Sequence, residues 1–190
     1  MPALPKFAHV VFQTSQPDAM RDWYCQVLDA HVVYEDDGLA FITFDAEHHR
    51  VALIKAPTSL ERRTSNVAAM HHVAYTFSAL DDLLERYAML RDKEITPVVS
   101  IAHGPTTSMY YRDPDGNLIE MQFDCFSEPD EATAYMHGSD FAADSVGPAF
   151  DPEEMLRARS NGAMVEDLTT REWARRAGLP DPMPALLDVR

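Results

Sequence analysis

Two stretches of the chain share one pattern of apolar and polar positions. Residues 9–28 and 72–91 each begin with a short run of valine and aromatic residues and continue with apolar residues at helical spacing. Aligned without gaps, they are identical at His9/His72, Val10/Val73, Ser15/Ser78, Asp18/Asp81 and Tyr24/Tyr87. We interpret the two stretches as copies of one strand–helix unit.

The helix of each copy has its own start signal. In the second copy Ser78 is a predicted N-cap, and Asp81 follows it three residues later, as in a capping box. In the first copy Pro17 suits the first helical turn. The predicted apolar faces comprise Trp23, Tyr24, Val27 and Leu28 in the first helix, and Leu80, Leu83, Leu84, Tyr87 and Leu90 in the second.

Three strand-like segments follow each predicted helix. They cover 32–34, 39–44 and 50–55 in the first copy, and 95–100, 107–112 and 118–123 in the second. A strong turn signal, residues 113–117 with the sequence DPDGN, precedes the last strand. Each copy therefore reads βαβββ, and the predicted fold class is α+β.

A module of this size buries too little surface to be stable alone, so we expect the two modules to pair. The prediction is one domain over residues 6–126, with module 1 at 6–56, module 2 at 70–126 and a polar linker at 57–69. Paired in this way, the modules would form a concave mixed sheet around a metal site.

The remaining residues, 127–190, form a C-terminal extension with weaker patterning. Asp151 and Pro152 predict the start of a helix that Gly162 ends, and residues 170–177 predict another that ends at Gly178. We find no candidate catalytic residue in this extension. We expect a helical tail that packs on the domain or on a dimer partner, with an active-site lid as the alternative.

Composition narrows the function. The chain has 190 residues and a formal net charge of −15, which disfavours binding to nucleic acid or to an anionic membrane surface. No apolar run is long enough to span a bilayer, and the first residues do not form a secretory signal. Two cysteines in 190 residues make no disulfide framework, so we expect a cytoplasmic protein. A homodimer is the default assembly.

Two repeated histidines and one carboxylate form the candidate metal site. His9 and His72 occupy the same position of the duplicated strand, and Glu120 interrupts an otherwise apolar strand. A strand histidine is most often structural, and a strand glutamate can pair with a basic residue, so both alternatives stay open. Side-chain parity, however, allows all three groups to share one sheet face.

Two imidazoles and one carboxylate make the facial triad of a non-haem Fe(II) centre, with open positions for substrate and dioxygen. Mn(II) suits the same ligands. We align the strand of Glu120 with residues 51–53 of the first copy, which puts Leu53 where a fourth ligand would stand. The prediction is therefore three protein ligands.

These residues and their surroundings resemble a known family. The motifs are the His9 strand, the segment 47–53 (EHHRVAL), the segment 71–73 (HHV), His103, and the segment 110–120 (YYRDPDGNLIE). Over residues 6–126 they resemble the vicinal oxygen chelate superfamily of glyoxalases, bleomycin-resistance proteins and dioxygenases, and within it the one-domain type I extradiol catechol dioxygenases. The tail segment 140–148 (DFAADSVGP) resembles the tails of that branch.

The resemblance implies a role for each site residue. His9, His72 and Glu120 would bind Fe(II). His49 would stabilise activated dioxygen and donate a proton, and His103 and Tyr110 would hydrogen-bond the reacting oxygens. Tyr110 shares the parity of Glu120, whereas Tyr111 does not, and His48 and His71 are interpreted as structural. The segment before His103 lacks the arginine common in the family.

The implied activity is ring cleavage of a catechol, such as a 2,3-dihydroxybiphenyl-like substrate, with both atoms of O2 incorporated. A metal-dependent isomerase or lyase of the glyoxalase type is an alternative, but it usually needs the fourth ligand that Leu53 replaces. A drug- or small-molecule-binding protein on the same fold is a second alternative. Such a protein would not need His49, His103 and Tyr110 around the metal.

Overall fold

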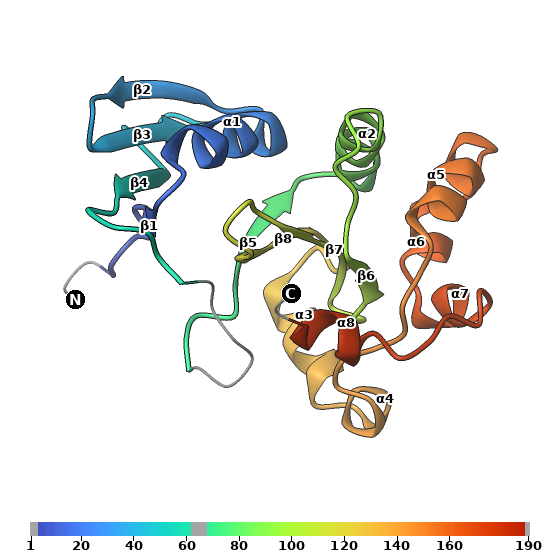
Figure 1. Ribbon diagram of the computed structural model, residues 1–190. Helices are drawn as coiled ribbons and strands as arrows, with labels where there is room; N and C mark the ends of the chain where they lie inside the picture. The colour runs from blue at the N-terminus through green and yellow to red at the C-terminus, as the bar shows by residue number, and fades with distance from the viewer. Residues whose placement is uncertain (1–3, 62–67, 189–190) are drawn as a thin grey trace. The chain divides into compact units, whose positions relative to one another are not determined.

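The computed structural model describes residues 4–61 and 68–188 and divides into two compact units. The first comprises Met1–Arg63 and Asp113–Asn117, and the second comprises Thr64–Arg112 and Leu118–Arg190. Each unit contains one four-stranded mixed sheet with a helix packed on it (Figure 1). The predicted α+β class is therefore confirmed. The predicted linker 57–69 lies partly outside the described residues.

The first unit has the predicted βαβββ order. Its elements are β1 (Val10–Thr14), α1 (Pro17–Leu28), β2 (His31–Glu35), β3 (Leu39–Thr43) and β4 (Val51–Lys55). The sheet order is β1-β4-β3-β2, and β1 is parallel to β4. Helix α1 starts at Pro17, as predicted, and buries Met20, Tyr24 and Val27 against β3 and β4. Trp23 and Leu28 are only half-buried.

The second unit repeats this order. Its elements are β5 (His72–Phe77), α2 (Leu80–Arg91), β6 (Val99–Ala102), β7 (Thr106–Arg112) and β8 (Leu118–Asp124), arranged as β5-β8-β7-β6. The predicted apolar face of α2 is confirmed, because all five of its residues are buried. Burying five large side chains at about 1.5–3 kcal/mol each is the main reason why this helix stays on the sheet.

Two local predictions in the second unit are wrong. Helix α2 has Ala79 as its N-cap and no side-chain cap, so Ser78 and Asp81 form no capping box. Asp81 and Asp82 stand instead in the first turn, where their charges favour the helix N-terminus. Strand β6 begins at Val99 rather than at residue 95, because Pro97 has no N–H to offer the sheet and pairing with β7 starts only after it.

The C-terminal extension is helical and belongs to the second unit. It contains α3 (Pro129–Met136), α4 (Ser139–Ala143), α5 (Pro152–Ser160), α6 (Val165–Leu168), α7 (Arg171–Arg175) and α8 (Met183–Leu187). The start of α5 is confirmed, since the Asp151 carboxylate accepts a hydrogen bond of 2.9 Å from the Glu153 N–H. Gly162, with φ of 93°, follows its end. Helices α3, α4, α6 and α8 had no clear sequence signal.

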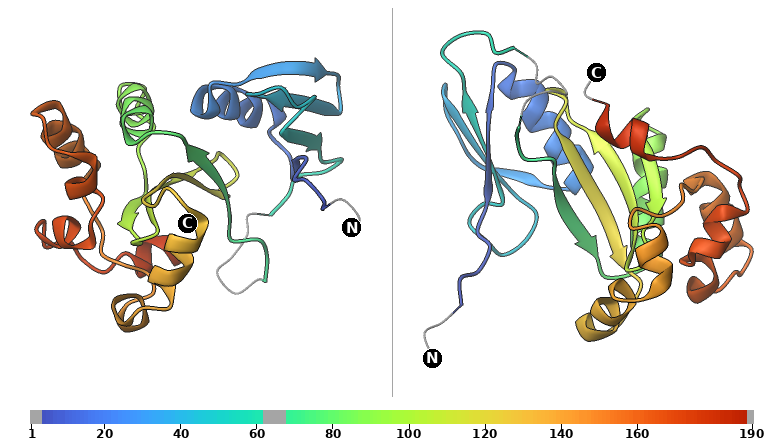
Figure 2. Two further views of the ribbon diagram at one scale, coloured as in Figure 1. Left: turned by 180° about the vertical axis from the view of Figure 1, so that it is seen from behind. Right: turned by 90° about the horizontal axis from the view of Figure 1, so that it is seen from below.

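Ion pairs join the extension to α2. Arg91 Nη1 lies 2.6 Å from Glu153 Oε2, to which the Tyr87 hydroxyl also donates at 3.2 Å. The Arg159 guanidinium forms a two-pronged contact with Asp81 at 2.6 and 2.8 Å. Helix α5 therefore runs beside α2 (Figure 2).

Among residues 4–61 and 68–188, no helix has the length and apolar character needed to cross a membrane.

The cap of α5 provides a test of how the extension is held. Replacing Asp151 by Ala removes the acceptor for the Glu153 N–H, and we expect the free energy of unfolding to fall by about 1 kcal/mol. Asp151→Asn is the matched control, because its amide oxygen still accepts this hydrogen bond. Denaturant unfolding measures both changes, and an equal loss in the two variants would contradict a capping role.

Candidate active site

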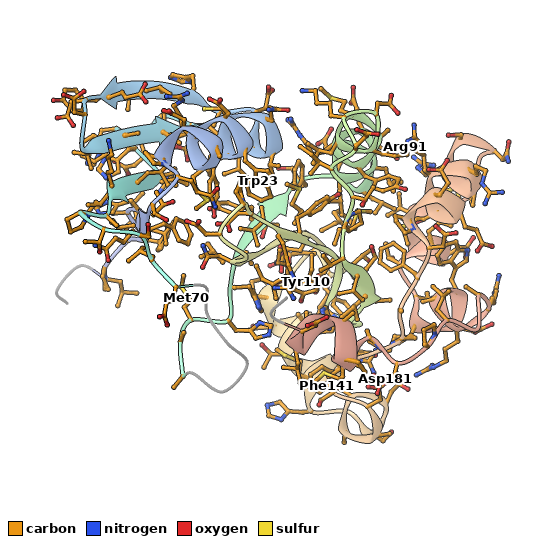
Figure 3. The ribbon with its side chains drawn as sticks, viewed as in Figure 1. Trp23, Met70, Arg91, Tyr110, Phe141 and Asp181 are labelled. Carbon is orange, nitrogen blue, oxygen red and sulfur yellow. The ribbon has the colours of Figure 1, made fainter. Side chains whose placement is uncertain are left out.

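In the second unit, neighbouring strands bring His72, Tyr110 and Glu120 together. Strand β8 lies between β5 and β7, and Glu120 stands opposite Ala74 on one side and Tyr110 on the other. His72 lies two residues before Ala74 and therefore on the same face of β5. His72 Nε2 lies 3.0 Å from Glu120 Oε2, and the Tyr110 hydroxyl, labelled in Figure 3, donates to Glu120 Oε1 at 2.9 Å.

The Glu120 carboxylate is buried but keeps its charge. Only 7% of its side chain is exposed, and burial by itself would raise its pKa. Hydrogen bonds from His72, Ser108 and Tyr110 stabilise the ionised form and outweigh burial, so the pKa of Glu120 is lowered. The second unit thus holds an anionic oxygen pair beside an imidazole.

His103 extends this network from the loop after β6. Its Nε2 lies 2.9 Å from the Tyr110 hydroxyl, and its Nδ1 lies 2.5 Å from the Val146 carbonyl oxygen in the extension. Burial lowers the pKa of His103, so the imidazole is neutral at pH 7. Burial and the Glu120 charge raise the pKa of Tyr110, so its phenol keeps its proton. One hydroxyl therefore stands between a neutral imidazole and a carboxylate.

Tyr111 lies in a different environment. It is 1% exposed, and its hydroxyl lies 3.8 Å from the Met109 sulfur. Burial raises the pKa of this phenol as well, but Tyr111 points into the core. Of the two tyrosines, Tyr110 is the one that contacts His103 and Glu120.

The first unit places His9 and His49 side by side. His9 lies one residue before β1, next to Phe7 and Ala8, whose carbonyls accept hydrogen bonds from Arg50 at 2.9 and 3.0 Å. The His9 and His49 ring centroids are 4.3 Å apart, and the Phe41 ring stacks on His49 at the same distance. Burial, with the nearby His9 and His48, lowers the pKa of His49, which is therefore neutral at pH 7.

Both histidines interpreted as structural contact a predicted site residue. Nδ1 of His48 lies 2.6 Å from Nδ1 of His49, and Nδ1 of His71 lies 2.7 Å from Nδ1 of His72. When His72 donates its Nδ1–H to His71, the lone pair of Nε2 is left for a metal. His71 can thus set the tautomer that a ligand needs.

The donor set fits a divalent metal ion. His72 and Glu120 form an adjacent nitrogen–oxygen pair in the second unit, and His9 belongs to the first. Within the described part of either unit, no three His, Cys, Asp or Glu side chains cluster closely enough to hold a metal ion. Joint ligation by His9, His72 and Glu120 stays a prediction.

The strand register corrects the alignment of the two modules on which the predicted ligand count rests. Val11 pairs with Ala52 in the first sheet, as Ala74 pairs with Glu120 in the second. The counterpart of Glu120 is therefore Ala52, not Leu53, which faces the core and is fully buried. The alignment was off by one residue, but the equivalent position still carries no carboxylate.

Sequence reasoning missed Arg171, which comes from the extension. This residue is 4% exposed, and its guanidinium donates to the backbone carbonyl of His103. No motif or spacing predicts this contact, since 68 residues separate the two positions.

Replacing Tyr110 by Phe tests the network directly. Glu120 and His103 would lose their shared hydroxyl, and we expect the free energy of unfolding of the metal-free protein to fall by about 1–3 kcal/mol. The pKa of Glu120 should rise, because the Tyr110 hydrogen bond is one of those that lower it. Urea unfolding and carboxyl NMR titration measure these effects. Tyr111→Phe, which loses only a weak contact with sulfur, should leave the pKa of Glu120 unchanged, and a rise there would contradict the assignment.

Comparisons with known proteins found curated relatives that match almost the whole chain. Over 188 residues the chain is 60% identical to biphenyl-2,3-diol 1,2-dioxygenase 2 and 47% identical to biphenyl-2,3-diol 1,2-dioxygenase 3, both from Rhodococcus globerulus. Each alignment covers 98% of this chain and 99% of the relative. A glyoxylase/bleomycin resistance protein/dioxygenase domain from Frankia sp. EAN1pec shares the fold, with a TM-score of 0.55 and 15% identity. The match covers 66% of this chain and 96% of that one.

The sequence profile of one family matches residues 6–121, more than half of the chain. The matched region contains every predicted site residue, from His9 to Glu120. The chain belongs to the Glyoxalase/Bleomycin resistance protein/Dioxygenase superfamily.

Proposed function

We propose that the protein is an extradiol dioxygenase that opens the ring of a biphenyl-2,3-diol-like catechol with O2. One observation carries this proposal: the 60% identity to a biphenyl-2,3-diol 1,2-dioxygenase, which extends over 98% of the chain and includes the extension. The network around Glu120 supplies the groups that such a reaction needs, an anionic ligand, a proton donor and a proton acceptor.

Dioxygenases of this superfamily use a divalent metal ion, and we propose Fe(II), held by His9, His72 and Glu120. Two imidazoles and one carboxylate suit Fe(II) and leave coordination positions open, and Mn(II) suits the same groups. The metal would supply the redox centre at which the catechol and dioxygen meet. The ionised Glu120 and the position of His72 Nε2, 3.0 Å from Glu120 Oε2, are the features of this chain that favour such binding.

His103 and Tyr110 are proposed to manage the protons of the catechol. The neutral His103 imidazole has a lowered pKa, so its Nε2 can accept a proton that a substrate hydroxyl releases. The Tyr110 phenol keeps its own proton and donates a hydrogen bond towards the reacting oxygens. Because both side chains contact each other at 2.9 Å, they orient one another before the substrate binds.

His49 is proposed to act on the dioxygen side of the reaction. Its ring stacks on Phe41 and lies against His9, and these ring contacts orient its plane without using its nitrogen atoms. Its Nδ1 contacts His48, so Nε2 is the atom that can present a proton to a developing negative charge. His9, at 4.3 Å between ring centroids, places this donor beside a proposed metal ligand.

No specific observation favours the two alternatives, the glyoxalase-type isomerase or lyase and the binding protein. The isomerase would use a fourth ligand, and Ala52 occupies the position that corresponds to Glu120. For the assembly and the compartment we propose a homodimer in the cytoplasm. Both cysteines, Cys25 and Cys125, are free thiols, as a reducing compartment would keep them.

Metal loading and turnover test the proposal together. The chain, loaded with Fe(II) without air, should bind the metal and form a yellow ring-fission product when 2,3-dihydroxybiphenyl and air are added. Replacing His9, His72 or Glu120 by Ala should weaken iron binding by more than about 100-fold, since even outer partners of a metal ligand are worth about 10- to 100-fold.

His31→Ala is the control, because His31 lies on the exposed strand β2, outside the proposed site. This variant should bind iron and turn over as the unaltered chain does. Iron binding without colour across a panel of catechols would contradict ring cleavage. Unchanged iron affinity in Glu120→Ala would contradict the ligand set.

His49→Phe separates binding from turnover. The phenyl ring can keep the stacking on Phe41 but has no nitrogen to donate a proton. We expect iron and catechol binding to persist, while turnover falls by about 100-fold or more, as is typical when a general acid is lost. Isothermal titration and oxygen-consumption kinetics measure the two effects, and unchanged turnover would remove His49 from the reaction.

A further inference from the structure

We propose that Arg171, on α7 of the C-terminal extension, is a positioning residue for ring cleavage that acts through His103. The inference rests on the proposed role of His103. It assigns a part in the reaction to the extension, which lies beyond residues 6–121 that the family profile matches.

Arg171 holds two segments together with one buried guanidinium. Its Nε lies 2.9 Å from the His103 carbonyl oxygen, and Nη2 donates to the same oxygen. On its other side Nη1 donates to the carbonyls of Asp144 at 2.7 Å and Asp140 at 3.3 Å. Only an arginine offers such a planar fork of donors, because lysine is a single point charge on a flexible stem.

Aromatic rings fix the guanidinium in place. Its central carbon lies 5.6 Å from the centroid of the Tyr135 ring and 5.5 Å from that of Phe141. The Tyr135 hydroxyl in turn donates to Asp140 Oδ2 at 2.7 Å. Helices α3 and α4 therefore enclose the Arg171 side chain, and its 4% exposure follows from this enclosure.

The segment held by Arg171 also contacts the His103 imidazole. Asp144 Oδ1 accepts hydrogen bonds from the N–H groups of Val146 at 3.2 Å and Gly147 at 2.8 Å, which shapes a tight turn. This turn presents the Val146 carbonyl to His103 Nδ1 at 2.5 Å. A carbonyl only accepts, so the proton of the neutral ring stays on Nδ1. Nε2 then has a lone pair and competes with Glu120 Oε1 for the single proton of the Tyr110 hydroxyl.

Gly147 permits the close approach that this arrangement needs. Its φ is +97°, and a Cβ atom there would lie 2.2 Å from the Ala102 carbonyl oxygen. After it the chain continues along β6, with the Ala102 N–H donating to Pro148 at 3.0 Å. Arg171 thus controls the backbone of His103 directly and its imidazole through the turn at Val146.

The spectroscopic test uses the metal-free full-length protein with 15N-labelled histidine. His103→Asn identifies the His103 signals by their loss. The unaltered chain should show His103 with its proton on Nδ1. In Arg171→Met the proton should move to Nε2 or exchange between the two nitrogens. An unchanged Nδ1–H signal in Arg171→Met would overturn the proposal, whether or not the protein cleaves catechols.

The kinetic test asks whether Arg171 acts through His103. Arg171→Met should lower kcat by about 10- to 100-fold, as expected when a reacting group is displaced by about 1 Å, and Arg171→Lys should restore part of it. In a His103→Ala background the same substitution should lower kcat less than about twofold, because coupled residues are not additive. An equal loss in both backgrounds would show a merely structural role and overturn the proposal.

Arg159→Met is the matched control. It breaks another contact between the extension and the second unit, the ion pair with Asp81, without touching His103. Both kcat and the His103 signal should stay as in the unaltered chain.

If Arg171→Met fails to fold, Arg171→Lys carries both tests, and an intermediate shift of the His103 signal is then expected. If the unaltered chain cleaves no catechol, the proposed function fails, and the NMR result still decides whether Arg171 positions His103.

Discussion

A buried carboxylate in the middle of a β-sheet is the constraint on which the site depends. An unpaired buried charge costs several kcal/mol, so Glu120 is stable in β8 only because the strands on both sides supply partners. Strand β5 supplies His72 and strand β7 supplies Tyr110. The parallel pairing on one side and the antiparallel pairing on the other set the register of these donors. The sheet order β5-β8-β7 is therefore as much a condition of the chemistry as the residues themselves.

The features that the sequence predicts well are those that depend on local periodicity. The five buried residues of α2 stand at helical spacing, and the common face of Glu120 and Tyr110 follows from the two-residue period of strands. The errors arise where a single residue decides between close alternatives. Pro97 delays the start of β6, and the one-residue shift between Ala52 and Leu53 becomes visible only in the strand register.

The contacts of the extension could not be predicted from the sequence, for a different reason. Arg171 and His103 are 68 residues apart, and Val146 contributes a backbone carbonyl, which every residue has. No residue type or spacing can predict which backbone carbonyl will contact the site, because only its position in the fold decides this. Helix α5 was predictable from Asp151 and Pro152, because its signal is a local cap, whereas the packing of the extension around the site is tertiary.

The charges of the proposed ligand set match the substrate class. Glu120 contributes one negative charge, and histidine ligands bind a metal as neutral imidazoles. A divalent cation held by these groups keeps one net positive charge, which favours an anionic partner such as a catechol that has lost one proton. His103, kept neutral by burial, is able to accept that proton. A charged imidazolium already carries both of its ring protons and could not accept another. The same burial that makes Glu120 dependent on its neighbours thus keeps His103 unprotonated and available as a base.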